Sequence, residues 1–191
     1  MKKSLIAIGI FALALNASAL SFQWAATGVA FDGATLKNST AITGYLIYLG
    51  NGGSLDENYS LGSCTTGEDV AKSIGAVVDT KNKTSAVGKI QNTYTFDFGS
   101  EPGKNGDVFA LLLEYKTSEK TYVNLASTTM TLSGLEDDTS SISNPTFSLS
   151  YGSSSESSKV SGGGGWVAVP EPSTAALALA GLALLLKRRK A

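Results

Sequence analysis

The chain has 191 residues, a formal net charge of −1, no histidine and a single cysteine, Cys64. The lack of histidine excludes Ser-His and Cys-His catalysis and the common zinc sites. A lone cysteine excludes an intrachain disulfide, so we expect Cys64 to be a half-buried small residue, with an intermolecular link or a reactive thiol as alternatives.

Residues 1–19 have the features of a secretory signal peptide. Two lysines precede a short apolar run over residues 4–15, and Ala17 and Ala19 form a small-x-small cleavage site. The mature chain is therefore expected to begin at Leu20, and signal peptidase and the general export machinery are the expected partners. An uncleaved anchor helix is the alternative, which the short apolar run disfavours.

Residues 20–151 are expected to form one mostly β passenger domain, an antiparallel β-sandwich or a jelly-roll-like fold. The segment is rich in β-branched and aromatic residues and is punctuated by Gly and Asn turn signals. Within residues 92–99, Tyr94, Phe96 and Phe98 alternate with polar residues, which indicates a half-buried strand. Other strands are expected, in chain order, at 22–30, 43–53, 127–132 and 144–152.

Two segments have more specific patterns. Residues 68–76 place apolar residues at helical offsets, which predicts a short helix followed by a strand or loop. Residues 107–128 predict a hairpin with its turn at Ser118 and Glu119. The first strand of this hairpin is nearly continuous in apolar residues, so we expect it to be central in its sheet.

The charge of the passenger limits its partners. Residues 20–169 carry 9 Lys+Arg against 15 Asp+Glu, a net charge of −6. Nucleic-acid binding needs a basic surface, so no nucleic acid is expected as a partner. The acidic run at residues 136–138 has ligands suited to calcium, but a loop of solvated acids is the expected arrangement. No metal and no cofactor are expected.

Three roles of the passenger stay open. We favour a non-enzymatic structural or adhesive protein of an extracellular polysaccharide matrix. A carbohydrate-binding module would use exposed aromatic side chains, and the candidates are Trp24, Tyr48, Tyr59 and Tyr122. A glycoside hydrolase would need a pair of carboxylates flanking a sugar. Asp97 and Glu114 lie on predicted strands, but nothing in the sequence pairs them, and solvated surface carboxylates are expected.

A Ser/Gly-rich linker over residues 152–166 is expected to join the passenger to a C-terminal segment, residues 167–191. Residues 173–186 are uncharged and rich in Ala and Leu, which predicts a short hydrophobic transmembrane helix. Such a helix would be about 21 Å long, against a hydrocarbon core of about 30 Å. Residues 167–169 are therefore expected to dip into the membrane interface near Trp166.

A cluster of cations closes the chain: Lys187, Arg188, Arg189 and Lys190. Positive residues stay in the cytoplasm, so the passenger would be held on the outer side of the inner membrane. Ahead of the apolar run, Pro170 and Pro172 disfavour helix. Together with Glu171 they are expected to form an extended, accessible peptide, the form that a protease or transpeptidase binds.

This order of parts resembles the PEP-CTERM sorting signal of exported bacterial proteins, which also carries the label "ice-binding protein C-terminal domain". The resemblance covers residues 170–191. It implies that Pro170, Glu171 and Pro172 are recognised by a membrane enzyme, exosortase, and that the closing cations retain the end of the chain. It also implies an inner-membrane intermediate with a cytoplasmic C-terminus, followed by delivery to the cell surface or medium. A plain C-terminal membrane anchor is the alternative.

Overall fold

The computed structural model describes residues 19–55, 61, 64–137, 139–142, 146–147 and 165–170. Within them the chain is mostly β, with one short helix, α1 (Gly67–Ile74). The strands are β1 (Ala19–Thr27), β2 (Ala30–Phe31), β3 (Ala34–Thr35), β4 (Ala41–Asn51), β5 (Ala76–Lys83), β6 (Lys89–Asp97), β7 (Asp107–Lys116), β8 (Thr121–Leu125), β9 (Met130–Thr131), β10 (Thr146–Phe147) and β11 (Val167–Ala168).

The larger sheet is antiparallel and has the strand order β11-β8-β7-β4-β5, with β9 also paired to β7. The hairpin predicted within residues 107–128 is formed by β7 and β8, and its turn contains Ser118 and Glu119 as expected. β7 lies between β4 and β8, so its predicted central position is confirmed. The predicted strand at 43–53 is present as β4.

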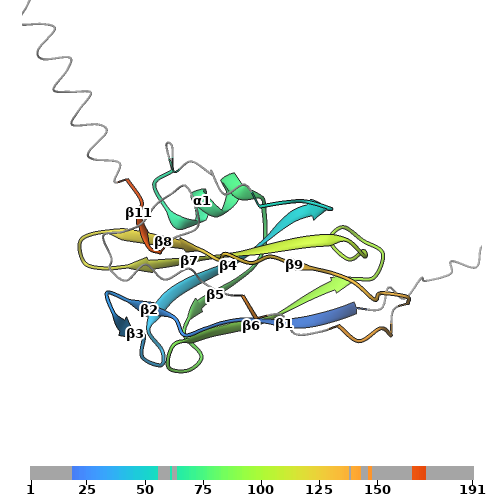
Figure 1. Ribbon diagram of the computed structural model, residues 1–191, viewed down its shortest axis with the longest axis horizontal. Helices are drawn as coiled ribbons and strands as arrows, with labels where there is room; N and C mark the ends of the chain where they lie inside the picture. The colour runs from blue at the N-terminus through green and yellow to red at the C-terminus, as the bar shows by residue number, and fades with distance from the viewer. Residues whose placement is uncertain are drawn as a thin grey trace, which may run out of the picture.

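The smaller sheet has the order β10-β1-β6 and lies against one face of the larger sheet (Figure 1). β1 pairs with β6 along its whole length, from Ala19 opposite Asp97 to Thr27 opposite Lys89. β1 and β10 are parallel, which differs from the all-antiparallel expectation. Only Thr146 and Phe147 of the strand expected at 144–152 lie within the described residues.

Aromatic side chains fill the space between the two sheets. Phe22 of β1 packs against Phe109 of β7, with ring centroids 5.6 Å apart, and against Tyr94 of β6 at 5.7 Å. Trp24 is completely buried, and its indole N–H donates to the Asp79 carboxylate at 2.7 Å. Since Trp24 is closed off in this core, it cannot be the exposed sugar-stacking residue that the sequence suggested.

The opposite face of the larger sheet is covered by α1. Val70 and Ala71 of the helix pack against Leu112 of β7 and Val123 of β8 in a second apolar core. The helix predicted at 68–76 is thus confirmed, and it starts with a capping box in which Thr66 and Asp69 bond to each other's backbone N–H. β7 is buried on both faces, and this explains why its apolar residues are consecutive and do not alternate.

One expectation about strand faces was wrong. The alternation in residues 92–99 placed Phe98 with Tyr94 and Phe96, but β6 ends at Asp97 and Phe98 is 38% exposed in the following turn. The weak strand expected at 127–132 is short, and only Met130 and Thr131 pair with β7.

A buried carboxylate organises the loop that leads into β7. Asp107 is fully buried and accepts hydrogen bonds from the backbone N–H groups of Gly103 at 2.6 Å and Lys104 at 2.8 Å. The hydroxyl of Tyr48 and the amide of Asn51 donate to its other oxygen, each at 3.1 Å. Burial acts to raise the pKa of Asp107, but these donors prevail and hold the pKa below its ordinary value.

We expect this carboxylate to make the fold sensitive to acid. Because the folded pKa of Asp107 is lowered, its stabilising contribution is present above the unfolded-state pKa of about 4 and is lost as pH falls further. Asp107→Asn should reduce the free energy of unfolding by about 3 kcal/mol at neutral pH. It should also flatten the pH dependence below about pH 4.

The measurement is urea unfolding of residues 20–170 at a series of pH values. Asp97→Asn, at the exposed end of β6, is the matched control and should behave as the unsubstituted protein. If Asp107→Asn and the unsubstituted protein lose the same free energy of unfolding on acidification, Asp107 is not the source of the acid sensitivity.

Candidate functional site

The short strand β11 places the start of the C-terminal segment on the folded domain. Val167 is opposite Val123, and Ala168 is opposite Tyr122, so β11 extends the edge of the larger sheet next to β8. The backbone N–H of Val169 then donates to the carbonyl oxygen of Thr121 at 2.8 Å. Pro170 has no N–H with which to continue the ladder, and this ends the strand.

Trp166 anchors this strand from the side of the smaller sheet. Its indole N–H donates to the carbonyl oxygen of Ala30 at 2.7 Å, and the residue is 5% exposed. Its ring lies 5.6 Å from that of Phe31 and 6.1 Å from that of Tyr115. Phe31 also packs against Tyr122 at 5.0 Å, so the four rings form one cluster. The indole therefore links β11 to a segment 136 residues earlier in the chain.

The other face of β11 packs into the second apolar core, which lies between α1 and the larger sheet and is called the helix-side core below. Val167 and Val169 are 7% and 3% exposed and lie with Val123 and Leu125 of β8 in that core. Trp166 points into one core and the two valines into the other, so the segment before Pro170 is held from both sides.

This arrangement differs from the sequence-based expectation. We expected residues 167–169 to dip into the membrane interface beside Trp166, because tryptophan favours that interface. The structure instead buries Trp166, Val167 and Val169 in the β domain, whereas Ala168 is exposed. The missed signal is the short, continuous apolar run Trp-Val-Ala-Val, with two β-branched residues and a proline directly after it, which is typical of a short buried strand.

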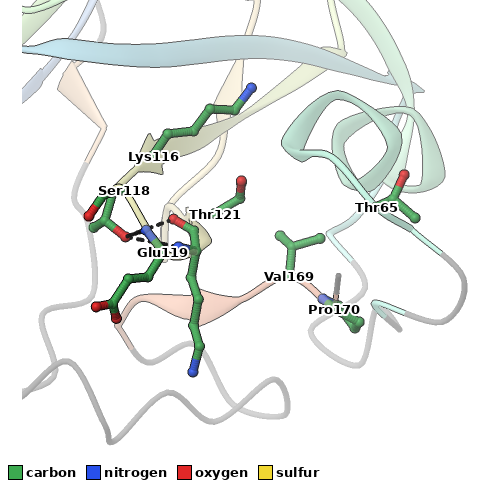
Figure 2. Close-up of a pocket in the computed structure, with 9 residues that line it drawn as sticks. Thr65, Lys116, Ser118, Glu119, Thr121, Val169 and Pro170 are labelled. Atoms are coloured by element: carbon green, nitrogen blue, oxygen red, sulfur yellow. Dashed lines mark hydrogen bonds between the residues drawn. The ribbon is translucent and has the colours of Figure 1, made fainter. Parts of the chain in front are cut away.

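A shallow hollow of about 210 Å³ lies beside Pro170, between β11 and the β7–β8 turn (Figure 2). Its lining comes from Thr65, residues 116–121, Val169 and Pro170. The side chain of Lys116 points away from Pro170 and forms an ion pair with the buried Glu114 at 2.9 Å. The turn itself is held by Thr117, whose hydroxyl accepts from the N–H groups of Glu119 and Lys120 at 3.2 and 3.0 Å.

The expected start of the mature chain, at the beginning of β1, lies at the opposite end of the domain (Figure 1). Ala19, the last residue of the predicted signal peptide, is the first residue of β1 and pairs with Asp97. Leu20, the expected new N-terminus, is 8% exposed. Because strands rise about 3.3 Å per residue, Ala19 lies about 26 Å from Thr27 at the other end of β1. Ala17 falls outside the described residues.

The remaining sorting residues also fall outside the described residues: Glu171, Pro172, Lys187, Arg188, Arg189 and Lys190. The same holds for the expected transmembrane helix at 173–186. Among the residues that the structure describes, no helix has the length and apolar character needed to cross a membrane.

The residues considered for sugar binding are mostly not available on the surface. Tyr48 is half-buried and bonded to Asp107, and Tyr122 is half-buried against Phe31. Trp24 is buried, so the expectation that these three aromatic side chains are exposed was wrong. Tyr59 lies outside the described residues. The large apolar side chains exposed in the described part of the chain are Val87 and Phe98.

The structure does not bring the two candidate carboxylates together. Glu114 is buried beneath α1, where it accepts from the Tyr45 hydroxyl, and burial raises the pKa of that hydroxyl. Asp97 is exposed at the end of β6 in the smaller sheet. The stacked sheets are about 10 Å apart and lie between the two groups, so one sugar cannot contact both.

The structure also describes the surroundings of Cys64 and of Asp137 in the acidic run. Cys64 is half-buried and packs against the helix-side core, as expected of a small apolar residue. The carboxylate of Asp137 accepts from the N–H and hydroxyl of Thr139, and these bonds lower its pKa. Within the described residues, no group of three or more potential ligand side chains is placed to hold a metal ion.

Comparison with known proteins identifies the C-terminal segment. Residues 168–190 match the PEP-CTERM protein-sorting motif. The match begins at the second residue of β11 and includes Pro170. No curated protein and no solved structure matches the chain.

We expect β11 to contribute to the stability of the domain. A chain ending at Gly165 lacks Trp166 and both valines, so it should be less stable than a chain ending at Pro170 by about 4 kcal/mol, the range of a buried Trp→Ala change. Trp166→Phe should cost about 1 kcal/mol, since it removes only the bond to Ala30 and part of the ring. Urea unfolding followed by circular dichroism measures all three, and equal midpoints would show that β11 is not docked.

The position of Ala19 predicts that signal-peptide cleavage precedes folding. A peptidase needs an extended, free substrate, but in the folded domain Ala19 and Leu20 belong to the β1–β6 ladder. Folded precursor should therefore be cut more than about tenfold more slowly than unfolded precursor, because the ladder must first open.

The measurement is gel analysis with purified signal peptidase, and mass spectrometry should identify Leu20 as the new N-terminus. A Gly-Ser-Gly-Ser insertion between Ala19 and Leu20 moves the site off the ladder and should remove the difference. Equal rates for the folded and unfolded natural precursor would refute the prediction.

Proposed function

We propose that this chain is an exported envelope protein, held in the inner membrane by its C-terminal tail until exosortase processes it for delivery to the cell surface or medium. The observation that carries the proposal is the match of residues 168–190 to the PEP-CTERM protein-sorting motif, which implies export and exosortase processing. The signal peptide at residues 1–19 is consistent with this route.

The geometry of the β domain supports the same route. The apolar run begins four residues after Val169, so the chain can separate β11 from the run by at most about 15 Å. The edge of the larger sheet would thus lie close to the membrane surface, with the closing cations on the cytoplasmic side. The start of β1 is at the far end of the domain and would point outward (Figure 1).

For the passenger we propose a structural or adhesive role in an extracellular polysaccharide matrix, without enzymatic activity. The burial of Trp24 and the half-burial of Tyr48 and Tyr122 disfavour an aromatic sugar-binding platform. The separation of Asp97 and Glu114 disfavours the carboxylate pair of a glycoside hydrolase. The domain is acidic, and the described part of it exposes few large apolar side chains, which suits a hydrated matrix.

The sorting route predicts a specific defect in Pro170→Ala combined with Pro172→Ala. Alanine restores the backbone N–H and permits helix, so the recognition peptide would no longer be extended. The full-length variant should accumulate in the inner membrane, whereas the unsubstituted protein should lose about 20 residues. The measurement is a blot of membrane and medium fractions with an antibody against the passenger.

A strain without exosortase should reproduce the defect with the unsubstituted protein. Val87→Ala, at an exposed position outside the sorting motif, is the control and should be processed normally. If the unsubstituted protein stays full length in the inner membrane and the double proline change alters nothing, the tail is a plain anchor.

A further inference from the structure

We propose that the sorting enzyme contacts the folded passenger as well as the linear motif, through a surface that we call the turn surface: Thr65 and residues 116–121. The inference rests on the proposed processing by exosortase and adds a second recognition element to it. The turn surface lines the shallow hollow together with Val169 and Pro170, with the β7–β8 turn on one side of these two residues and Thr65 on the other (Figure 2).

Proximity is the first argument. The N–H of Val169 is bonded to the Thr121 carbonyl, and Glu171 follows two residues later. Since consecutive Cα atoms are 3.8 Å apart, the Cα of Glu171 lies within about 8 Å of that of Val169. An enzyme that encloses the motif must therefore bring its own surface against the β7–β8 turn.

The anchoring of β11 keeps Val169 and Pro170 beside the turn surface. Withdrawal of β11 would expose Trp166, Val167 and Val169, which are 5%, 7% and 3% exposed in the fold. It would also break the bonds from Trp166 to Ala30 and from Val169 to Thr121. Pro170, the first residue of the Pro-Glu-Pro peptide, is thus presented together with the turn surface.

The turn surface has the polar, preorganised character of a protein contact. Thr117 fixes the turn through its bonds to the N–H groups of Glu119 and Lys120, and both of these residues are exposed. In the described part of the chain, neither Glu119 nor Lys120 takes part in an ion pair. Two opposite charges on a rigid turn can therefore pair with complementary charges on an enzyme.

The charge balance favours a protein partner over lipid headgroups. Lys116 is neutralised by Glu114, and Lys120 is adjacent to Glu119. With Glu114 counted, the two lysines of the turn surface are balanced by two glutamates, so it has no cluster of unpaired cations to attract it to an anionic bilayer.

The test compares charge reversals in the full-length protein in cells that contain exosortase, with the rate of tail loss followed by pulse–chase. Glu119→Lys and Lys120→Glu should each slow processing about tenfold, the effect of one lost charge pair at an interface. Lys83→Glu, at the exposed end of β5 on the opposite edge of the larger sheet, is the matched control and should be processed normally. Thermal unfolding should show that all three variants are folded.

The two reversals also distinguish the partner. An enzyme surface predicts slower processing for both, whereas an anionic membrane predicts that Glu119→Lys accelerates processing and Lys120→Glu slows it, with a matching change in binding to anionic phospholipid vesicles. This opposite response would overturn the proposal in favour of the membrane.

A spacer tests whether the motif must lie next to the turn surface for the enzyme to recognise both. Ten Gly/Ser residues inserted between Val169 and Pro170 would move the motif about 18 Å from the turn on average. Processing should fall to the rate of Lys120→Glu, and adding that reversal should have no further effect. If the spacer and both reversals leave processing unchanged, the turn surface is not recognised, although the sorting route stands. The sorting route itself fails only if the unsubstituted protein is not processed.

Discussion

The burial of β7 on both faces is the constraint on which the rest of the molecule depends. One face meets the aromatic residues of the smaller sheet, and the other meets α1, so the strand is apolar along nearly its whole length. The Tyr45 hydroxyl donates to one oxygen of the buried Glu114 and Lys116 forms an ion pair with the other, and these two contacts offset the cost of burying the carboxylate. α1 begins directly over this side chain at Gly67, where a Cβ atom would lie only 2.7 Å from side-chain atoms of Glu114. β8 pairs with β7, and β11 pairs with β8, so the position of β7 determines the positions of both strands.

Local patterns in the sequence were sufficient for the elements that depend on neighbouring residues. The β7–β8 hairpin, α1 and β4 are confirmed, because turn residues, helical offsets and apolar runs are properties of short segments. The sorting motif was also recognisable locally, since proline geometry, an apolar length and a cation cluster do not require tertiary contacts.

The environment of the aromatic residues could not be predicted in the same way. Trp24 is buried against Asp79, 55 residues away, and Tyr48 is bonded to Asp107, 59 residues away. Trp166 depends on Ala30, which is even more distant in sequence. A tryptophan near an apolar tail fits a membrane interface and a sheet edge equally well by composition. The partner that decides between them lies at the other end of the chain.

The position of β11 has a consequence for the timing of export. A chain that crosses the membrane from its N-terminus presents β1 first, but the larger sheet lacks its last strand until Val167 and Ala168 have emerged. The sorting motif begins at Ala168 and so emerges together with the end of this strand. Completion of the sheet and arrival of the motif outside the membrane thus occur at nearly the same point of translocation. A chain whose motif has emerged has therefore also exported every residue of the domain.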